Sequence, residues 1–325
     1  MIVPRYWSES KTKKIVEGRQ FTIKRFGWSD LSEQDAKAHA DDRLKEAVKT
    51  LETEGDVRRI DHKTSYNGAE GIPIREEVIS KHQDVIISRN SYGSLCLNTP
   101  DVMFADIDFE YEASFKTHVV AFIFLSFCAA IISLFFKSWL ALFLSAIAVL
   151  VFIPTMAKLI HRMILSLNGG FERKAIETIK KVSIESPELH FRLYRTPLGF
   201  RVLLMNDTYS PTSDTAINLL KDLQSDSIYV QMCKNQNCFR ARVSPKPWRI
   251  GIERIKPQPG VWPIKEERMK DRREWVDMYE KKAKNYSSCH FLMQLGSVKV
   301  SPKAEFVRKI HDDLCKVSSS ELSTA

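Results

Sequence analysis

Two aspartates at the end of an apolar run are the first candidates for chemistry in this sequence. The run 102–105 is followed by Asp106-Ile107-Asp108, and because side chains alternate along a strand, both carboxylates would project from one face. Such a pair can hold a divalent cation, usually Mg²⁺, which shares its other positions between water and phosphate oxygens. The pattern predicts a magnesium site at Asp106 and Asp108. The alternatives are solvated side chains at a strand terminus, or a carboxylate paired with a nearby arginine.

A second set of side chains is basic and could bind phosphate. Arg240 and Arg242 would share a face of an extended chain, and guanidinium groups bind phosphate through two parallel hydrogen bonds. Phe239 and Trp248 could stack a base or pack the loop. If the acidic and basic sets converge, they supply the parts of a phosphoryl- or nucleotidyl-transfer site. The alternative is a structural ion-pair network or contact with lipid head groups. The predicted phosphate or nucleic-acid ligands are Arg195, Arg201, Arg240, Arg242, Lys246 and Arg249.

The cysteines and the common catalytic motifs add little. The six cysteines contain no CxxC pair, and reduced thiols are the default for a cytoplasmic protein. Cys233 and Cys238, with the adjacent Cys289-His290, could make a four-ligand zinc site, although their spacing is not that of a zinc motif. P-loop, GxGxxG, HExxH and serine-hydrolase patterns are absent from the sequence. The sequence therefore names no catalytic residue.

The elements that must position these residues flank a long apolar stretch. Residues 117–136 and 139–156 are two apolar segments separated only by Lys137-Ser138, and each is long enough to cross a bilayer as a helix. The stretch 117–157 is therefore predicted to be a transmembrane α-helical hairpin. The alternative is a buried helix pair in a soluble protein, but such helices usually keep a polar face.

Charge on the two sides of this stretch predicts its orientation. Lys116 precedes it, Lys158 and Arg162 follow it, and the turn offers only Lys137, so both termini are expected to be cytoplasmic. The start of the chain has no apolar core, and no cleavable signal is expected. Residues 1–116 carry 18 Lys and Arg against 21 Asp and Glu, whereas residues 157–325 carry 30 against 19. The basic half could meet anionic lipid or a polyphosphate ligand.

The remaining sequence predicts an α+β cytoplasmic domain, with an antiparallel or mixed sheet and helices, that the membrane hairpin interrupts. Segment 1–116 would end in the strand that carries Asp106 and Asp108, segment 158–317 would be basic and α+β, and the serine-rich tail 318–325 would be disordered. Turn residues at 65–77 predict a loop. Strands are predicted at 20–26, 84–88, 94–98, 101–110, 190–195, 200–205, 227–232 and 291–295, and helices at 32–54, 172–182, 212–224, 266–285 and 302–317.

Several stretches resemble a widespread bacterial protein family that is generally described as hypothetical or transmembrane. They are MIVPRYW, RQFTIKRFGWSD, SYNGAEGIPIREEV, RNSYGSLCLNTPDVMFADIDFE, YRTPLGFRVLL and CFRARVSPKPWRIG. The resemblance covers most of the chain and carries no established activity. With the apolar spans, it implies a multi-pass protein of a bacterial inner membrane.

A looser resemblance concerns the strand ending in Asp106-Ile107-Asp108 and the strand-turn-strand that follows. These are similar to the catalytic core of archaeo-eukaryotic primases and primase-polymerases, which implies that Asp106 and Asp108 bind metal. In those proteins a histidine in an S-x-H pattern contacts the nucleotide, whereas here the turn 196–201 reads TPLGFR and ends in Arg201. A third acidic ligand is not identifiable, Asp207 and Asp226 being guesses. These departures put polymerisation in doubt more than nucleotide or nucleic-acid binding.

Other classes of protein also use a pair of aspartates, and the sequence does not decide among them. GGDEF-type cyclases have a comparable pair but need a GG[DE]EF turn that this sequence lacks, and membrane glycosyltransferases use DxD with a nucleotide sugar. The sequence therefore predicts a membrane-anchored protein with a metal-dependent nucleotide or nucleic-acid site, an enzyme only if transfer occurs there. The contrasting hypothesis is a non-catalytic membrane protein whose basic half binds anionic lipid or a protein partner.

Overall fold

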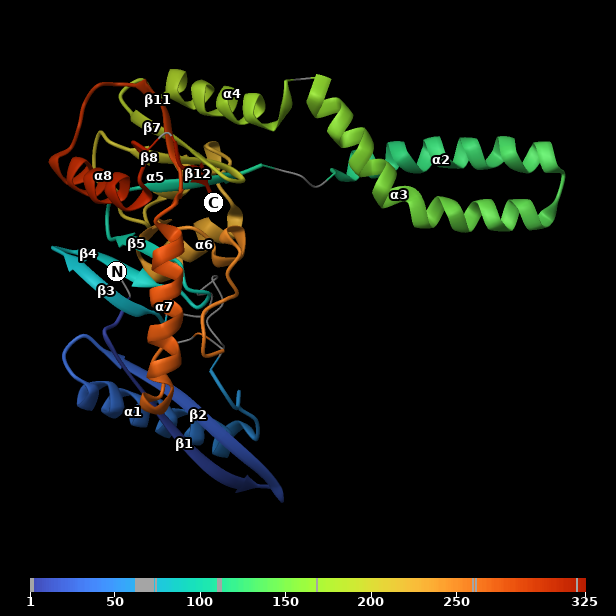
Figure 1. Ribbon diagram of the computed structural model, residues 1–325. Coiled ribbons are helices and arrows are strands. Elements are labelled where there is room, and N and C mark those ends of the chain that lie inside the picture. Colours follow the sequence, from blue (N-terminus) through green and yellow to red (C-terminus); the bar gives the residue numbers. More distant parts are fainter. Residues whose placement is uncertain are drawn as a thin grey trace. The chain divides into compact units, whose positions relative to one another are not determined.

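The chain folds into two compact units of an α+β structure with antiparallel sheets, as a computed structural model shows (Figure 1). The structure describes residues 3–61, 73, 75–109, 113–167, 169–258, 260, 262–319 and 321–325. The first unit, here called the α+β unit, comprises Met1–Ile107 and Ser183–Ala325. The second, the hairpin unit, comprises Asp108–Val182. The predicted loop 65–77 lies mostly outside the described residues.

The elements follow one another along the chain as Figure 1 labels them. The α+β unit contains β1 (Tyr6–Val16), β2 (Arg19–Ser29), α1 (Glu33–Glu54), β3 (Glu77–His82), β4 (Val85–Arg89), β5 (Leu95–Thr99), β6 (Phe104–Asp108), β7 (His190–Thr196), β8 (Gly199–Leu204), α5 (Asp214–Asp222), α6 (Ser227–Gln236), β9 (Phe239–Arg242), the short 3-10 helices η1 (Pro247–Ile250) and η2 (Glu266–Arg268), α7 (Met269–Ala283), β10 (Tyr286–Ser287), β11 (His290–Gly296), α8 (Pro302–Cys315) and β12 (Ser323–Thr324). The hairpin unit contains α2 (Phe115–Phe136), α3 (Trp139–Leu167) and most of α4 (Gly170–Glu185).

Two four-stranded sheets form the centre of the α+β unit, in the strand orders β3-β4-β5-β9 and β11-β7-β8-β6. In the first sheet, β9 pairs antiparallel with β5, so that Arg240 lies opposite Asn98. In the second, the hairpin β7–β8 turns at 197–198 as predicted, and β8 neighbours β6. Each sheet therefore combines strands from before and after residues 108–182.

The first 55 residues form a long β-hairpin, β1–β2, against which α1 packs through a small apolar cluster of Phe21, Ile23, Ala47 and Leu51. The predicted helix start and end are confirmed, because the Ser32 side chain accepts a hydrogen bond from Asp35 N and Gly55 adopts the left-handed conformation. Gly27 of β2 passes so close to α1 that an added Cβ would lie 2.2 Å from Ala36 O. Only glycine fits this crossing without displacing the helix.

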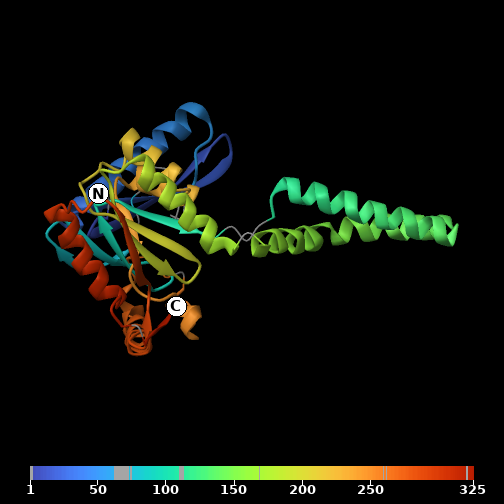
Figure 2. The same ribbon diagram turned by 90° about the horizontal axis from the view of Figure 1, so that it is seen from above.

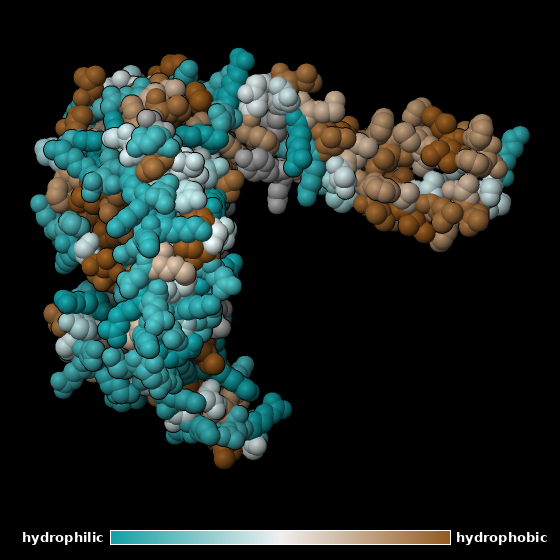
Figure 3. Space-filling view, viewed as in Figure 1, coloured by the Kyte–Doolittle hydropathy of each residue, from teal (hydrophilic) through white to brown (hydrophobic). Residues whose placement is uncertain are grey.

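In the hairpin unit, apolar side chains are mostly exposed, whereas those between α1 and the β1–β2 hairpin are buried. Helices α2 and α3 pack side by side, as both Figure 1 and Figure 2 show, and both are long and apolar enough to cross a membrane. Only 6% of the α2 span and 12% of the α3 span are buried within the structure. Figure 3 shows hydrophobic side chains covering the visible face of this pair. The two helices are therefore not buried in the core of this chain.

Two sequence predictions are wrong. Residues 227–232, predicted as a strand, begin α6, because Asp226 caps the helix through Tyr229 N and the buried residues recur with helical spacing at 229, 232, 233 and 236. The tail 318–325, predicted to be disordered, is ordered where described: β12 pairs with β10 and Ala325 is buried in an apolar cluster with Trp275. The other predicted helices and strands of the described chain are present, with shifts of a few residues at their ends.

Candidate functional site

Asp106, the first predicted magnesium ligand, is paired with a predicted phosphate ligand. Strands β6 and β8 are neighbours, and Arg201 Nε on β8 donates to Asp106 Oδ1 at 3.0 Å. Arg201 is only 2% exposed and also donates through Nη1 to the Arg242 carbonyl at 2.8 Å. Burial alone would lower the pKa of Arg201, but the charges of Asp106 and Cys289 raise it above its usual value. The guanidinium therefore stays charged and is held by the fold.

Asp108 ends β6, two residues after Asp106 on the same strand. Its side chain is exposed, whereas that of Asp106 is partly buried. The structure describes Asp106 as the partner of an arginine, which is one of the alternatives that the sequence left open. The magnesium site at Asp106 and Asp108 stays a prediction.

Arg240 is also engaged inside the fold. Its Nη2 lies 2.7 Å from both carboxylate oxygens of Glu76, and its Nη1 donates to Asn98 Oδ1 at 2.9 Å. Ser88 Oγ donates to the same carboxylate at 2.6 Å. Arg240 is 3% exposed, and the Glu76 carboxylate helps to raise its pKa well above the usual value against the opposing effect of burial. This is a buried structural network of the kind that the sequence left open as the alternative.

The remaining predicted phosphate ligands are spread over different elements. Arg195 closes the β7–β8 turn by donating to the Thr196 and Gly199 carbonyls, at 3.0 and 3.1 Å. Arg242 contributes its carbonyl to Arg201, while Lys246 and Arg249 flank Trp248 on or next to η1. The structure thus brings Arg201 to Asp106 and does not gather the basic set into one cluster.

Of Phe239 and Trp248, the two aromatic residues that the sequence places near the basic set, only Trp248 faces outward. Phe239 is fully buried in β9, whereas Trp248 is 46% exposed. The Lys246 ammonium lies 5.5 Å from the Trp248 ring centre, and the Arg254 guanidinium lies 5.4 Å from it. Tyr92 packs edge-on against the same ring. Both cations lie over the ring, so a base that stacked on Trp248 would take the place of one of them.

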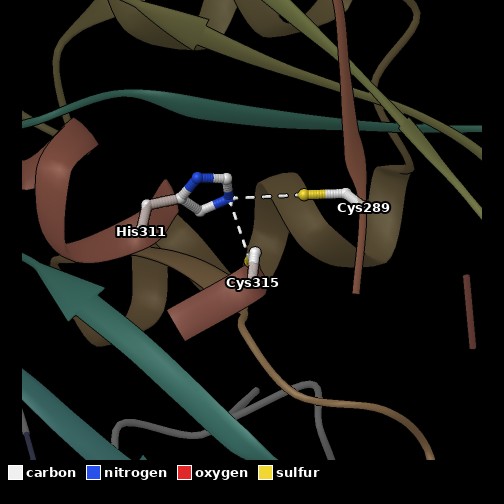
Figure 4. Close-up of side chains that lie close together, drawn as sticks. All are labelled: Cys289, His311 and Cys315. Atoms are coloured by element: carbon white, nitrogen blue, oxygen red, sulfur yellow. Dashed lines mark hydrogen bonds between the residues drawn. The ribbon is translucent and has the colours of Figure 1, made fainter. Parts of the chain in front are cut away.

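A cluster that the sequence did not predict lies beside Arg201. Cys289, immediately before β11, and His311 and Cys315 on α8 are completely buried, and their ligand atoms all lie within 4.8 Å of one another. His311 Nε2 is 3.9 Å from Cys289 Sγ and 3.5 Å from Cys315 Sγ. Figure 4 shows both sulfurs converging on this nitrogen. The available signal was the spacing of four residues between His311 and Cys315 on a predicted helix, which places them on one face.

A polar network fixes the imidazole ring from its other side. His311 Nδ1 lies 3.0 Å from Asp312 Oδ1, which also accepts from Tyr194 OH at 2.7 Å. Arg192 donates to the second oxygen of Asp312 at 3.1 Å. Although burial opposes it, hydrogen bonding by these neighbours lowers the pKa of Asp312. A carboxylate at Nδ1 favours the tautomer in which Nδ1 carries the proton and Nε2 presents its lone pair.

The zinc ligands considered from the sequence do not converge in the described structure. Cys238 follows Cys233 at the end of α6, and burial raises the pKa of both thiols. Cys289 lies with His311 and Cys315 instead. His290 points elsewhere, its Nε2 lying 2.9 Å from Ser287 Oγ. The His290 ring is thus held by Ser287 and the Leu322 carbonyl, not by the cysteine cluster.

Comparison with known proteins gives no family for this chain. No protein-family model, no curated protein and no solved structure matches it.

Proposed function

We propose that this chain is a membrane-anchored protein, in which α2 and α3 cross a bacterial inner membrane and the α+β unit lies at the cytoplasmic face. The observation that carries the proposal is the low burial of two consecutive apolar helices, 6% and 12%. Apolar side chains left outside a protein core are favourable only where the solvent is itself apolar. A bilayer supplies that solvent along α2 and along the apolar part of α3, residues 139–156.

The sheets of the α+β unit support an even number of crossings. β5 pairs with β9, and β6 neighbours β8, so hydrogen bonds join strands from before and after the hairpin unit. Strands of one sheet must lie on the same side of a bilayer. Two crossings satisfy this condition, and the basic residues after α3 favour the cytoplasmic side for both flanks.

Cysteine labelling in spheroplasts tests the insertion and its orientation. In Lys137→Cys, a membrane-impermeant maleimide is expected to label intact spheroplasts, because position 137 lies between α2 and α3. In the matched variant Ser319→Cys, labelling is expected only after lysis. The protein should also remain in the membrane pellet after an alkaline carbonate wash. Release by the wash, or equal labelling of Ser319→Cys before and after lysis, would overturn the proposal.

One observation favours a second function, the binding of a nucleotide or of single-stranded nucleic acid at Trp248. The ring is 46% exposed and carries Lys246 and Arg254 over it; a base would displace a cation from the ring, and that cation would then contact the phosphate. We propose this surface as the ligand site in place of a site built on Arg240, whose guanidinium is enclosed by Glu76 and Asn98.

Binding of labelled nucleoside triphosphates and short single-stranded DNA to the detergent-purified protein tests this second function. Trp248→Ala is expected to weaken binding about 5- to 150-fold, since base stacking is worth about 1–3 kcal/mol per base. Ile79→Ala removes an apolar side chain of similar exposure on β3 and should change nothing. Asp108→Asn in the presence of Mg²⁺ tests the magnesium prediction separately. Binding that falls with salt and is equal in all variants would indicate a basic surface for anionic lipid or a protein partner.

A further inference from the structure

We propose that Cys289, His311 and Cys315 form a thiolate-imidazole site for a borderline d-block cation, for which Zn²⁺ is the best fit. Two sulfur ligands and one imidazole nitrogen are the donors that zinc takes in proteins, whereas Mg²⁺ and Ca²⁺ take oxygen. The site lies wholly within the α+β unit. It is independent of the membrane anchoring and nucleotide binding proposed above.

The distances already suit a tetrahedral ion. Zn–S bonds of about 2.3 Å and Zn–N bonds of about 2.0–2.1 Å, at tetrahedral angles, place a nitrogen about 3.6 Å and a second sulfur about 3.8 Å from a given sulfur. His311 Nε2 lies 3.9 Å from Cys289 Sγ and 3.5 Å from Cys315 Sγ. Both nitrogen–sulfur distances therefore match those around a tetrahedral ion to within a few tenths of an ångström, and the two sulfurs lie within 4.8 Å of each other.

The imidazole nitrogen is over-subscribed without an ion. With the proton of His311 held at Nδ1 by Asp312, Nε2 has one lone pair. Three groups face it: the two sulfurs and Arg201 Nη1, which is 3.3 Å away. One lone pair accepts one good hydrogen bond, and Arg201 Nη1 already donates to the Arg242 carbonyl at 2.8 Å. The two sulfurs therefore share one nitrogen, and a cation held by Nε2 and both sulfurs would engage these three atoms at once.

The hydrogen bond between His311 and Asp312 is itself typical of metal-binding histidines. Such histidines usually donate their other ring nitrogen to a carboxylate or carbonyl, which orients the ring and raises its basicity. Here the carboxylate is held in turn by Tyr194 and Arg192. This chain of contacts orients Nε2 toward the two sulfurs before any ion arrives.

Charge also balances in the bound form. Zn²⁺ binds Cys289 and Cys315 as thiolates, so any thiol proton that either still holds passes to solvent, and the two thiolates then neutralise the ion. Arg201 beside the site is already neutralised by Asp106. A buried group of zero net charge avoids most of the cost of burying an unpaired ion. Three protein ligands leave one tetrahedral position for a water molecule, toward which Arg201 is a ready donor.

Metal analysis of the full chain, purified in detergent without chelators, tests the site. We expect about one zinc per chain by mass spectrometry, and cobalt substituted for it should give the near-ultraviolet charge-transfer absorption of thiolate-bound Co²⁺. Cys289→Ser and Cys315→Ser should each lower the metal content at least tenfold. Cys233→Ser is the matched control, because it alters a buried cysteine outside the cluster.

The wild-type protein keeps the test decisive if the serine variants do not fold. Removal of zinc by a chelator should lower the melting temperature, and added Zn²⁺ should restore it. Reduced wild-type protein that takes up neither Zn²⁺ nor Co²⁺ would overturn the proposal. So would a metal content that Cys289→Ser and Cys233→Ser lower equally.

Discussion

The interior of the α+β unit and the surface of the hairpin unit break the ordinary rule of burial in opposite directions. In the first, the guanidinium groups of Arg201, Arg240 and Arg272 are almost fully enclosed, and each meets a carboxylate. In the second, large apolar side chains such as Leu134, Phe135 and Trp139 are exposed over most of their area. Buried charges need partners, whereas exposed apolar side chains need a different solvent.

The difference shows that burial alone does not identify a site. A buried arginine in this fold indicates a structural partner rather than a ligand site. Arg201, Arg240 and Arg272 pair with Asp106, Glu76 and Glu77, respectively. Exposed apolar side chains that form a continuous helix face indicate an apolar surrounding. A single exposed apolar side chain indicates little. Two kinds of substitution test this account: removal of the partner of a buried charge, and introduction of a charge at an exposed apolar position.

The largest effect is expected from breaking a buried ion pair. Glu76→Ala leaves Arg240 charged and 3% exposed, with Asn98 as a remaining partner. Because arginine does not lose its proton in proteins, the free energy of unfolding should fall by about 3–5 kcal/mol. Urea unfolding in detergent measures it. Glu253→Ala removes the exposed partner of Lys256 and should cost about 0–1 kcal/mol. Equal losses in the two variants would contradict the comparison.

The same comparison predicts that one substitution has different consequences in the two units. Ile131→Arg on α2 should raise the apparent free energy of membrane insertion by about 2.5–3.5 kcal/mol, because the arginine would enter the hydrocarbon layer. A glycosylation-reporter insertion assay of the α2 span measures this quantity. Ile15 on β1 is also exposed, and Ile15→Arg should change the free energy of unfolding by less than about 0.5 kcal/mol. An Ile131→Arg span that inserts as readily as wild type would show that α2 does not meet lipid.

The smallest effect is expected where a charge pair stays in water. Glu305 and Arg308 pair at the start of α8, and this hydrogen bond is the first cause of the lowered pKa of Glu305. Glu305→Gln should cost about 0.2–0.5 kcal/mol at pH 7. A carboxyl with a lowered folded pKa stabilises above its unfolded pKa of about 4.3, and this is lost as the pH falls through the folded value. Unfolding at pH 7 and pH 3 should therefore show the difference between variant and wild type vanishing in acid. A difference that grows in acid would exclude this ion pair as its cause.

Local patterns in the sequence predicted much of the fold. Ser32 and Gly55 bound α1 as expected, and the alternation of 190–195 and 200–205 predicted the β7–β8 hairpin. These features depend on a few neighbouring residues, so a single sequence contains them. The prediction for residues 227–232 was wrong because their apolar positions fit a short strand as well as the first turns of α6. The helix forms because Asp226 caps it.

The candidate sites were predicted less well, because they depend on contacts between distant residues. Cys289 meets His311 across 22 positions, and Arg240 meets Glu76 across 164. No local pattern reports which carboxylate reaches which arginine. The sequence supplied the correct alternatives, a paired aspartate and an ion-pair network, but only the three-dimensional arrangement selects Arg201 for Asp106.

The assembly of each sheet from strands on both sides of residues 108–182 has a consequence for how the protein is made. Strands β5 and β6 leave the ribosome before their partners β9 and β8 have been synthesised. At about 5–20 residues per second, the intervening 108–182 alone takes about 4–15 s to translate. During that interval the unpaired strand edges are open to aggregation, so chaperone binding to the nascent chain should peak there and end when β9 emerges.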